Sequence, residues 1–125
     1  NPPETFENID EIITWLDQNV CYKDDQEIHN TLEYWQYPNE TYELKTGDCE
    51  DYVLLAMWFC VNSSVYSFTD VAFIVYRNDA GKHVILRIKD DYYETIYGYK
   101  MNINRSRILQ EVSYYDAMNR IQYWR

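Results

Sequence analysis

The chain has 125 residues and a formal net charge of −10, from 21 acidic and 11 basic residues, and 46% of its residues are hydrophobic. This length suits one domain with a substantial core, and the mixture of hydrophobic and charged residues excludes a disordered chain. The acidic excess argues against nucleic-acid binding, which needs a basic surface to displace counterions. We therefore expect a single domain over residues 1–125 that has no nucleic-acid partner.

Three cysteines, Cys21, Cys49 and Cys60, cannot all pair within one chain. A Cys21–Cys60 disulfide would leave Cys49 free, and spacing alone leaves this pairing open. With His29 and His83 as the two histidines and no C-x-x-C pair, no zinc-ligand cluster is evident. We expect no cofactor and no metal in catalysis. Activity that disappears on chelation and returns with a metal would contradict this.

The sequence contains no run of about 18 apolar residues, the length that a membrane span requires, and no signal-peptide pattern. It begins with Asn1, Pro2 and Pro3, as the trimmed end of a linker would. A signal or anchor could have been removed upstream. A fragment of a secreted or envelope protein is therefore one interpretation, and the compartment stays open.

The first half of the chain has helical periodicity. Apolar residues at helical spacing predict an amphipathic helix over 6–19, and a polar break follows at 23–27. Residues 28–37 are aromatic and compatible with a short helix, and Pro38 suits the first turn of another over 38–45. A central helix is predicted over 49–61, where apolar residues recur on one helical face.

The second half has strand patterns. Three runs rich in β-branched and aromatic residues, 70–76, 83–88 and 92–97, are joined by turn signals, which predicts an antiparallel meander. Residues 101–112 fit no clear pattern. Ser113 resembles a helix cap with Asp116 three residues on, so we expect a helix at the end of the chain. Helices followed by an antiparallel sheet define an α+β domain.

A cysteine lies at the start of the central helix, in the sequence Gly47-Asp48-Cys49-Glu50-Asp51. Gly47 interrupts the preceding segment, and Asp48 can cap the helix with Asp51 as its acidic partner. The positive end of a helix stabilises a thiolate over a thiol, which predicts a reactive cysteine with a lowered pKa. The alternative is a buried, inert cysteine, but the charges of Glu50 and Asp51 argue against burial of this turn.

A nucleophilic cysteine needs a base within hydrogen-bond reach and a third group that orients the base. His83 opens a predicted strand downstream of Cys49, whereas His29 lies in a polar segment upstream and is the weaker candidate. The alternative for His83 is an exposed histidine at a strand end.

Glu94, in the third predicted strand, is the leading candidate for the orienting group. Two hairpin registers are open, which place either Ile85 or Arg87 opposite Glu94, and in both Glu94 shares a sheet face with His83. Glu94 could equally form an ordinary cross-strand ion pair with Arg87. Other side chains able to orient an imidazole are Tyr97, Asn102 and Asn104.

Two segments resemble the transglutaminase-like cysteine protease superfamily, especially its small archaeal and bacterial members. They are the run Tyr34-Trp35-Gln36-Tyr37-Pro38-Asn39-Glu40-Thr41 and the block Gly47-Asp48-Cys49-Glu50-Asp51-Tyr52. The order of the predicted elements also agrees with that of the superfamily: a helix, a Cys-bearing helix, a His-bearing strand and an acid-bearing strand. The resemblance covers roughly residues 9–98. The resemblance implies a papain-like α+β core with the nucleophile on a central helix.

By position, the resemblance implies Cys49 as the nucleophile, His83 as its base and Glu94 as the acid of a triad. The Pro-Thr-like turn that usually follows the acid is shortened and imperfect here. Trp35 and Gln36 are candidates for the second oxyanion donor by sequence proximity alone.

Members of this superfamily cleave peptide or amide bonds, or transfer acyl groups from glutamine to amines. The resemblance thus implies a cysteine-dependent hydrolase or acyl transferase that acts on a peptide or protein substrate through a thioester. The alternative is a non-catalytic protein- or glycan-binding module on the same fold. The imperfect acid region and the abundance of aromatic residues motivate it.

Overall fold

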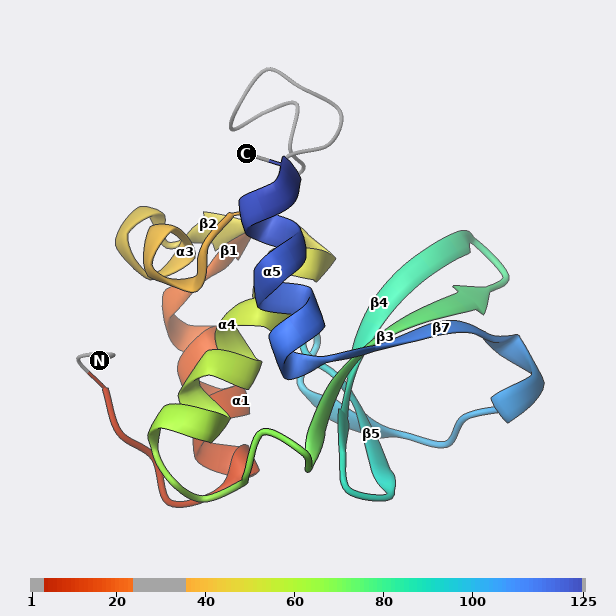
Figure 1. Ribbon diagram of the computed structural model, residues 1–125, viewed down its shortest axis with the longest axis horizontal. Coiled ribbons are helices and arrows are strands. Elements are labelled where there is room, and N and C mark those ends of the chain that lie inside the picture. The colour runs from red at the N-terminus through yellow and green to blue at the C-terminus, as the bar shows by residue number, and fades with distance from the viewer. Residues whose placement is uncertain (1–3, 24–35, 125) are drawn as a thin grey trace.

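The computed structural model describes residues 4–23 and 36–124. Figure 1 shows a group of helices on one side of the molecule and a strongly twisted antiparallel sheet on the other. This arrangement confirms the predicted α+β class. In chain order the elements are α1 (Ile9–Asn19), β1 (Cys21–Tyr22), α3 (Pro38–Leu44), β2 (Thr46–Gly47), α4 (Cys49–Asn62), β3 (Val71–Asn78), β4 (Gly81–Ile88), β5 (Asp91–Glu94), β6 (Tyr99–Met101), a 3-10 turn (Arg105–Arg107), β7 (Ile108–Ser113) and α5 (Tyr114–Trp124).

The main sheet has the strand order β6-β5-β4-β3-β7, and all neighbouring strands are antiparallel. Strands β3, β4 and β5 form the predicted meander. The predicted third strand was too long, because β5 ends at Glu94 and residues 95–98 form a turn. The N–H of Gly98 donates to the carbonyl of Glu94 at 2.9 Å, and Gly98 has a φ of 76°, which favours glycine.

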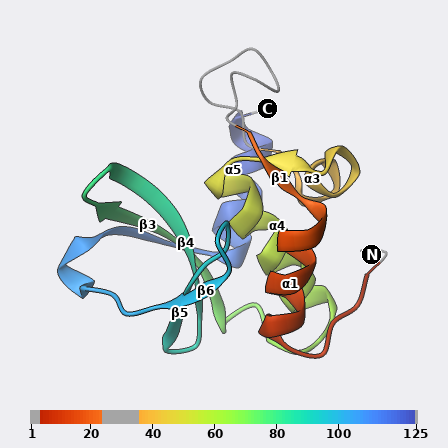
Figure 2. The ribbon, with the colours of Figure 1, turned by 180° about the vertical axis from the view of Figure 1, so that it is seen from behind.

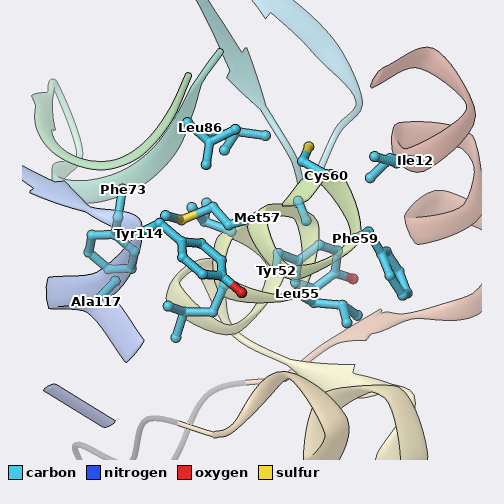
Figure 3. Packing of buried hydrophobic residues seen from close by; sticks show 14 of the residues in the cluster. Ile12, Tyr52, Leu55, Met57, Phe59, Cys60, Phe73, Leu86, Tyr114 and Ala117 are labelled. Carbon is cyan, nitrogen blue, oxygen red and sulfur yellow. The ribbon is translucent and has the colours of Figure 1, made fainter. Parts of the chain in front are cut away.

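Helix α4 occupies the centre of the molecule. Figures 1 and 2, taken from opposite sides, show it between α1 and α5. Its side chains from Tyr52 to Met57 are all buried, as expected of a helix covered on every side. In Figure 3 side chains from the sheet and α5 lie on the Met57 side of α4, and Ile12 of α1 lies on the side of Cys60 and Phe59. This packing fixes the N-terminus of α4 relative to β4.

The start of α4 is also held by a short parallel pair that the sequence did not predict. Strand β1 pairs with β2, with Cys21 opposite Thr46 and Tyr22 opposite Gly47. All three cysteines are free, Cys21 exposed and Cys60 fully buried, so a Cys21–Cys60 disulfide is not formed.

The helix expected over 28–37 lies almost entirely outside the described residues, as do His29 and Trp35. In the part of the chain that the structure describes, no helix has the length and apolar character to cross a membrane.

Candidate active site

The N-terminus of α4 is closed by the predicted capping box. Asp48 Oδ1 accepts the N–H of Asp51 at 3.3 Å, and the N–H of Asp48 donates to Asp51 Oδ2 at 3.1 Å. Cys49 is therefore the first residue of the helix, where its own N–H has no acceptor within the helix.

Asp51 is fully buried, contrary to the expectation that its charge would keep this turn accessible. Its carboxylate is satisfied inside the protein, because Oδ1 also accepts the backbone N–H of Gln36 at 3.0 Å. Burial and the neighbouring Asp48 carboxylate raise the pKa of Asp51. The backbone N–H groups of Gln36 and Asp48 lower it, but the first two effects are larger and the pKa is about 9. Asp51 thus ties the segment before α3 to the helix that bears the cysteine.

Cys49 is half-buried beside β4. Its Sγ lies 3.8 Å from Glu50 Oε2. Burial raises the pKa of the Cys49 thiol well above its ordinary value, and the carboxylates of Glu50 and Asp48 raise it further. The backbone N–H groups of Val84 and Glu50 hydrogen-bond the sulfur and act in the opposite direction. The expected lowering of the pKa by the helix terminus is therefore wrong for this arrangement, because burial and two adjacent carboxylates outweigh it.

His83, in β4, contacts Glu94 through a hydrogen bond between Nε2 and Oε1. Glu94 is buried, and its Oε2 accepts the backbone N–H groups of Ile96 at 2.6 Å and Tyr97 at 3.2 Å. Burial raises the pKa of Glu94, but the hydrogen bond and charge of His83 and these two N–H groups outweigh it, so the pKa is lowered overall. A carboxylate only accepts hydrogen bonds, so Nε2 of His83 carries a proton.

The hairpin register decides between the alternatives left open by the sequence. Ile88 pairs with Asp91 and Leu86 with Tyr93, so the turn centres on residues 89–90 and the ladder, if continued, places Ile85 opposite Glu94. Arg87 does not pair with Glu94, because its Nε lies 3.3 Å from Glu111 Oε1.

The other candidates for orienting the histidine contribute no side chain to it. Tyr97 is 76% exposed and reaches Glu94 only through its backbone. The Asn104 side chain accepts hydrogen bonds from the N–H and the hydroxyl of Ser106, and Asn102 is exposed.

Cys49 and His83 line the same pocket, which has a volume of about 410 Å³. The sequence predicted these two residues but not several others that line the pocket. Among them are Lys82 from β4, Gln110 from β7 and Arg120 from α5. These residues come from three separate elements and form no local motif, so only the fold brings them together.

Gln36 does not offer its side chain to a reaction at Cys49. Its Nε2 donates to Thr41 Oγ1 at 2.8 Å and to the carbonyl of Thr46 at 3.1 Å, which uses both amide hydrogens. The Gln36 side chain is fully buried and holds α3 and β2 together before α4.

An antiparallel sheet packed against a central helix that starts with a half-buried cysteine is the papain-like core of the transglutaminase type. Within this class, the chain belongs to the family of bacterial transglutaminase-like cysteine proteinases (BTLCP), which it matches over residues 2–115. None of the curated proteins compared with the chain matches it significantly.

Solved structures of LapG from Legionella pneumophila have a similar fold. The calcium-bound form has a TM-score of 0.65 and 16% identity, over 80% of this chain and 59% of that one. A second LapG structure has a TM-score of 0.63 and 16% identity, over 84% of this chain and 60% of that one. The EGTA-treated form has a TM-score of 0.63 and 16% identity, over 84% of this chain and 59% of that one. The chain thus spans about three-fifths of the length of these structures.

The calcium in one LapG structure raises the question of whether this chain can hold the ion. Among residues 4–23 and 36–124, no three His, Cys, Asp or Glu side chains are placed so that they could hold a metal ion. Both carboxylate oxygens of Asp51, a buried acid in the first turn of α4, already accept backbone N–H groups. As arranged, these residues do not fit calcium.

Proposed function

We propose that this domain cleaves peptide bonds in a protein or peptide substrate, with Cys49 as the nucleophile, His83 as its base and Glu94 as the group that orients the base. One observation supports these roles above the others. His83 is held by Glu94 at one ring nitrogen, while the same histidine lines a pocket together with Cys49. A cysteine nucleophile needs a base that a third group orients, and this arrangement supports the assignment of these roles.

The contact with Glu94 determines which nitrogen of His83 can act as the base. Because Nε2 donates its proton to Glu94, Nδ1 carries the free lone pair in the neutral ring. The lowered pKa of Glu94 keeps its carboxylate charged at neutral pH, and this charge stabilises the imidazolium that forms when Nδ1 takes a proton.

The raised pKa of Cys49 supports a mechanism that starts from the thiol. At neutral pH the thiol keeps its proton in the free protein, so proton transfer to His83 accompanies attack on the substrate carbonyl. The sulfur adds to the substrate carbonyl, and His83 then gives its proton to the leaving amine as the C–N bond breaks and the thioester forms. Water completes hydrolysis, whereas a second amine as acceptor would give acyl transfer.

The developing oxyanion requires preorganised donors. The free N–H of Cys49 at the start of α4 is one. The Gln36 side chain is not the second, because its amide hydrogens are already used.

The raised pKa of Cys49 also favours the competing function, a non-catalytic binding module on the same fold. Alkylation by iodoacetamide, followed by mass spectrometry at each cysteine, separates the two. If His83 is the base, His83→Gln should slow alkylation of Cys49 at pH 7 by about tenfold or more, within the usual worth of acid–base assistance. Exposed Cys21 is an internal control whose rate should not change. A Cys49 rate as low as that of buried Cys60, and unaffected by His83→Gln, would overturn the enzymatic proposal.

A further inference from the structure

The pocket beside Cys49 is locally cationic in an otherwise acidic protein. The chain carries a formal net charge of −10. Two cationic side chains line the pocket, Lys82 from β4 and Arg120 from α5, against one carboxylate, that of Glu50. Lys82 directly precedes His83, and Arg120 reaches the same pocket from the C-terminal helix.

These two cations differ from several others in the protein. Three other cations form ion pairs with carboxylates. The pairs are Arg87 with Glu111, Lys100 with Asp91 and Arg107 with Asp79. Within the described residues, the side chains of Lys82 and Arg120 form no hydrogen bond or ion pair. Arg120 is half-buried and Lys82 is exposed, so Arg120 is the more desolvated of the two charges.

Glu50 is the acidic residue that lines this pocket. Its carboxylate lies at the sulfur, with Oε2 3.8 Å from Cys49 Sγ, and it adds to the raised pKa of the thiol. An anionic group that enters the pocket is therefore repelled near the sulfur and attracted towards Arg120 and Lys82.

We infer that the pocket selects a substrate with an acidic side chain close to the scissile bond, bound by Arg120 with support from Lys82. This inference rests on the proposed function and names its substrate class. The planar guanidinium matches a carboxylate with two parallel hydrogen bonds, and pairing compensates the half-buried charge of Arg120. Exposed Lys82 contributes less, as exposed ion pairs do.

The first arm of the test measures cleavage of a library of internally quenched decapeptides that are varied at the four central positions. Wild-type protein should prefer Asp or Glu over Gln at one position by about tenfold in kcat/KM, the worth of one charge-assisted contact. Arg120→Gln should abolish most of this preference, and Lys82→Gln should abolish a smaller part. Arg120→Glu should change the preferred residue at that position from an acidic one to Lys. Arg105→Gln, at an exposed cation outside the pocket, is the matched control and should leave it unchanged. Cleavage without an acidic preference, or a preference that persists in the Lys82→Gln/Arg120→Gln double variant, would overturn the inference.

The second arm does not depend on cleavage. The rate of Cys49 alkylation by anionic iodoacetate is divided by the rate with neutral iodoacetamide. This ratio should fall by a few-fold or more in the double variant relative to wild type and to Arg105→Gln, because the local field that attracts the anion is removed. If no peptide is cleaved but the ratio falls, the proposed function fails while anion recognition by the pocket stands. An unchanged ratio rejects the anion-binding role even when peptides are cleaved.

Discussion

Gly47 lies directly against Asp51. A Cβ atom at position 47 would come within 2.6 Å of Asp51 Cβ and 3.1 Å of Oδ2, so the glycine is the one residue that lets the buried carboxylate close the capping box. Gly47→Ala should therefore lower the free energy of unfolding by about 1–3 kcal/mol, the usual cost of overpacking. Urea denaturation measures this. The exposed substitution Gln18→Ala in α1 is the control, and equal stability of the two variants would show that the helix start can shift without cost.

Glu94→Gln should reverse the tautomer of His83. In the wild type, Glu94 Oε2 accepts two backbone N–H groups, so the glutamine oxygen would take that position. The glutamine amide nitrogen would then face His83 Nε2, which would have to accept a hydrogen bond. The proton would then sit on Nδ1, the nitrogen assigned as the base. We expect turnover to fall by about 10²- to 10⁴-fold, as in serine protease triads that lose the orienting carboxylate.

Arg87→Gln is the matched control for Glu94→Gln, because Arg87 pairs with Glu111 on the same sheet. It should leave turnover near normal and change stability by about 1 kcal/mol or less. Equal turnover in both variants would remove Glu94 from the proposed triad.

Glu50→Gln should lower the pKa of the Cys49 thiol. Among the charged groups, the Glu50 carboxylate is the largest cause of the raised pKa, so its neutralisation favours the thiolate. The midpoint of the pH profile for Cys49 alkylation should move to lower pH. Asp90→Asn, in an exposed turn, should leave the midpoint in place. An unchanged midpoint in Glu50→Gln would mean that the Glu50 carboxylate does not raise the pKa of the thiol.

The stability of the protein should fall as the pH rises from about 4 to about 9. The pKa of Asp51 is about 9 in the folded protein against 3.8 ordinarily, so unfolding releases a proton throughout this window. A single such group gives a slope of up to about 1.4 kcal/mol per pH unit. The lowered pKa of Glu94 has the opposite effect on stability. The charged carboxylate stabilises the folded protein, and this stabilisation is lost as the pH falls below the ordinary pKa of 4.5.

Urea unfolding from pH 4 to pH 9 measures this slope. Asp51→Asn places an amide against a backbone N–H and should be less stable, but its slope should be flatter. The slope of Asp17→Asn, at an exposed site in α1, should match that of wild type. A wild-type slope near zero would mean that Asp51 is ionised in the folded protein.

The sequence predicted the elements whose signals are local. The cap of α4 and the first two strands of the meander were found because they depend on neighbouring residues and short-period patterns. Strand β7 was missed because four of its six residues are exposed and only Val112 is buried, so it has no alternating pattern. The pairing of His83 with Glu94 was one of two open alternatives, since the two hairpin registers could not be distinguished without the backbone.

The predicted end of β5 was wrong for a reason that concerns the site itself. Residues 95–97 are Thr, Ile and Tyr, which favour strands, so propensity alone continues the strand. The Glu94 carboxylate accepts hydrogen bonds from the N–H groups of Ile96 and Tyr97, so the chain forms a turn there and leaves the β4–β5 ladder. A side chain placed to hold the histidine thus also ends the strand.

The early end of β5 leaves a gap in the sheet beside β4. A ladder continued by two residues would put Thr95 opposite Val84, and strand pairing would then engage the N–H that now bonds the sulfur of Cys49. In the structure this N–H of β4 instead meets the cysteine at the start of α4. We therefore expect the length of β5 to affect the reactivity of Cys49. Replacing the turn at 95–98 so that β5 continues should close the site while leaving every side chain of the proposed triad in the sequence.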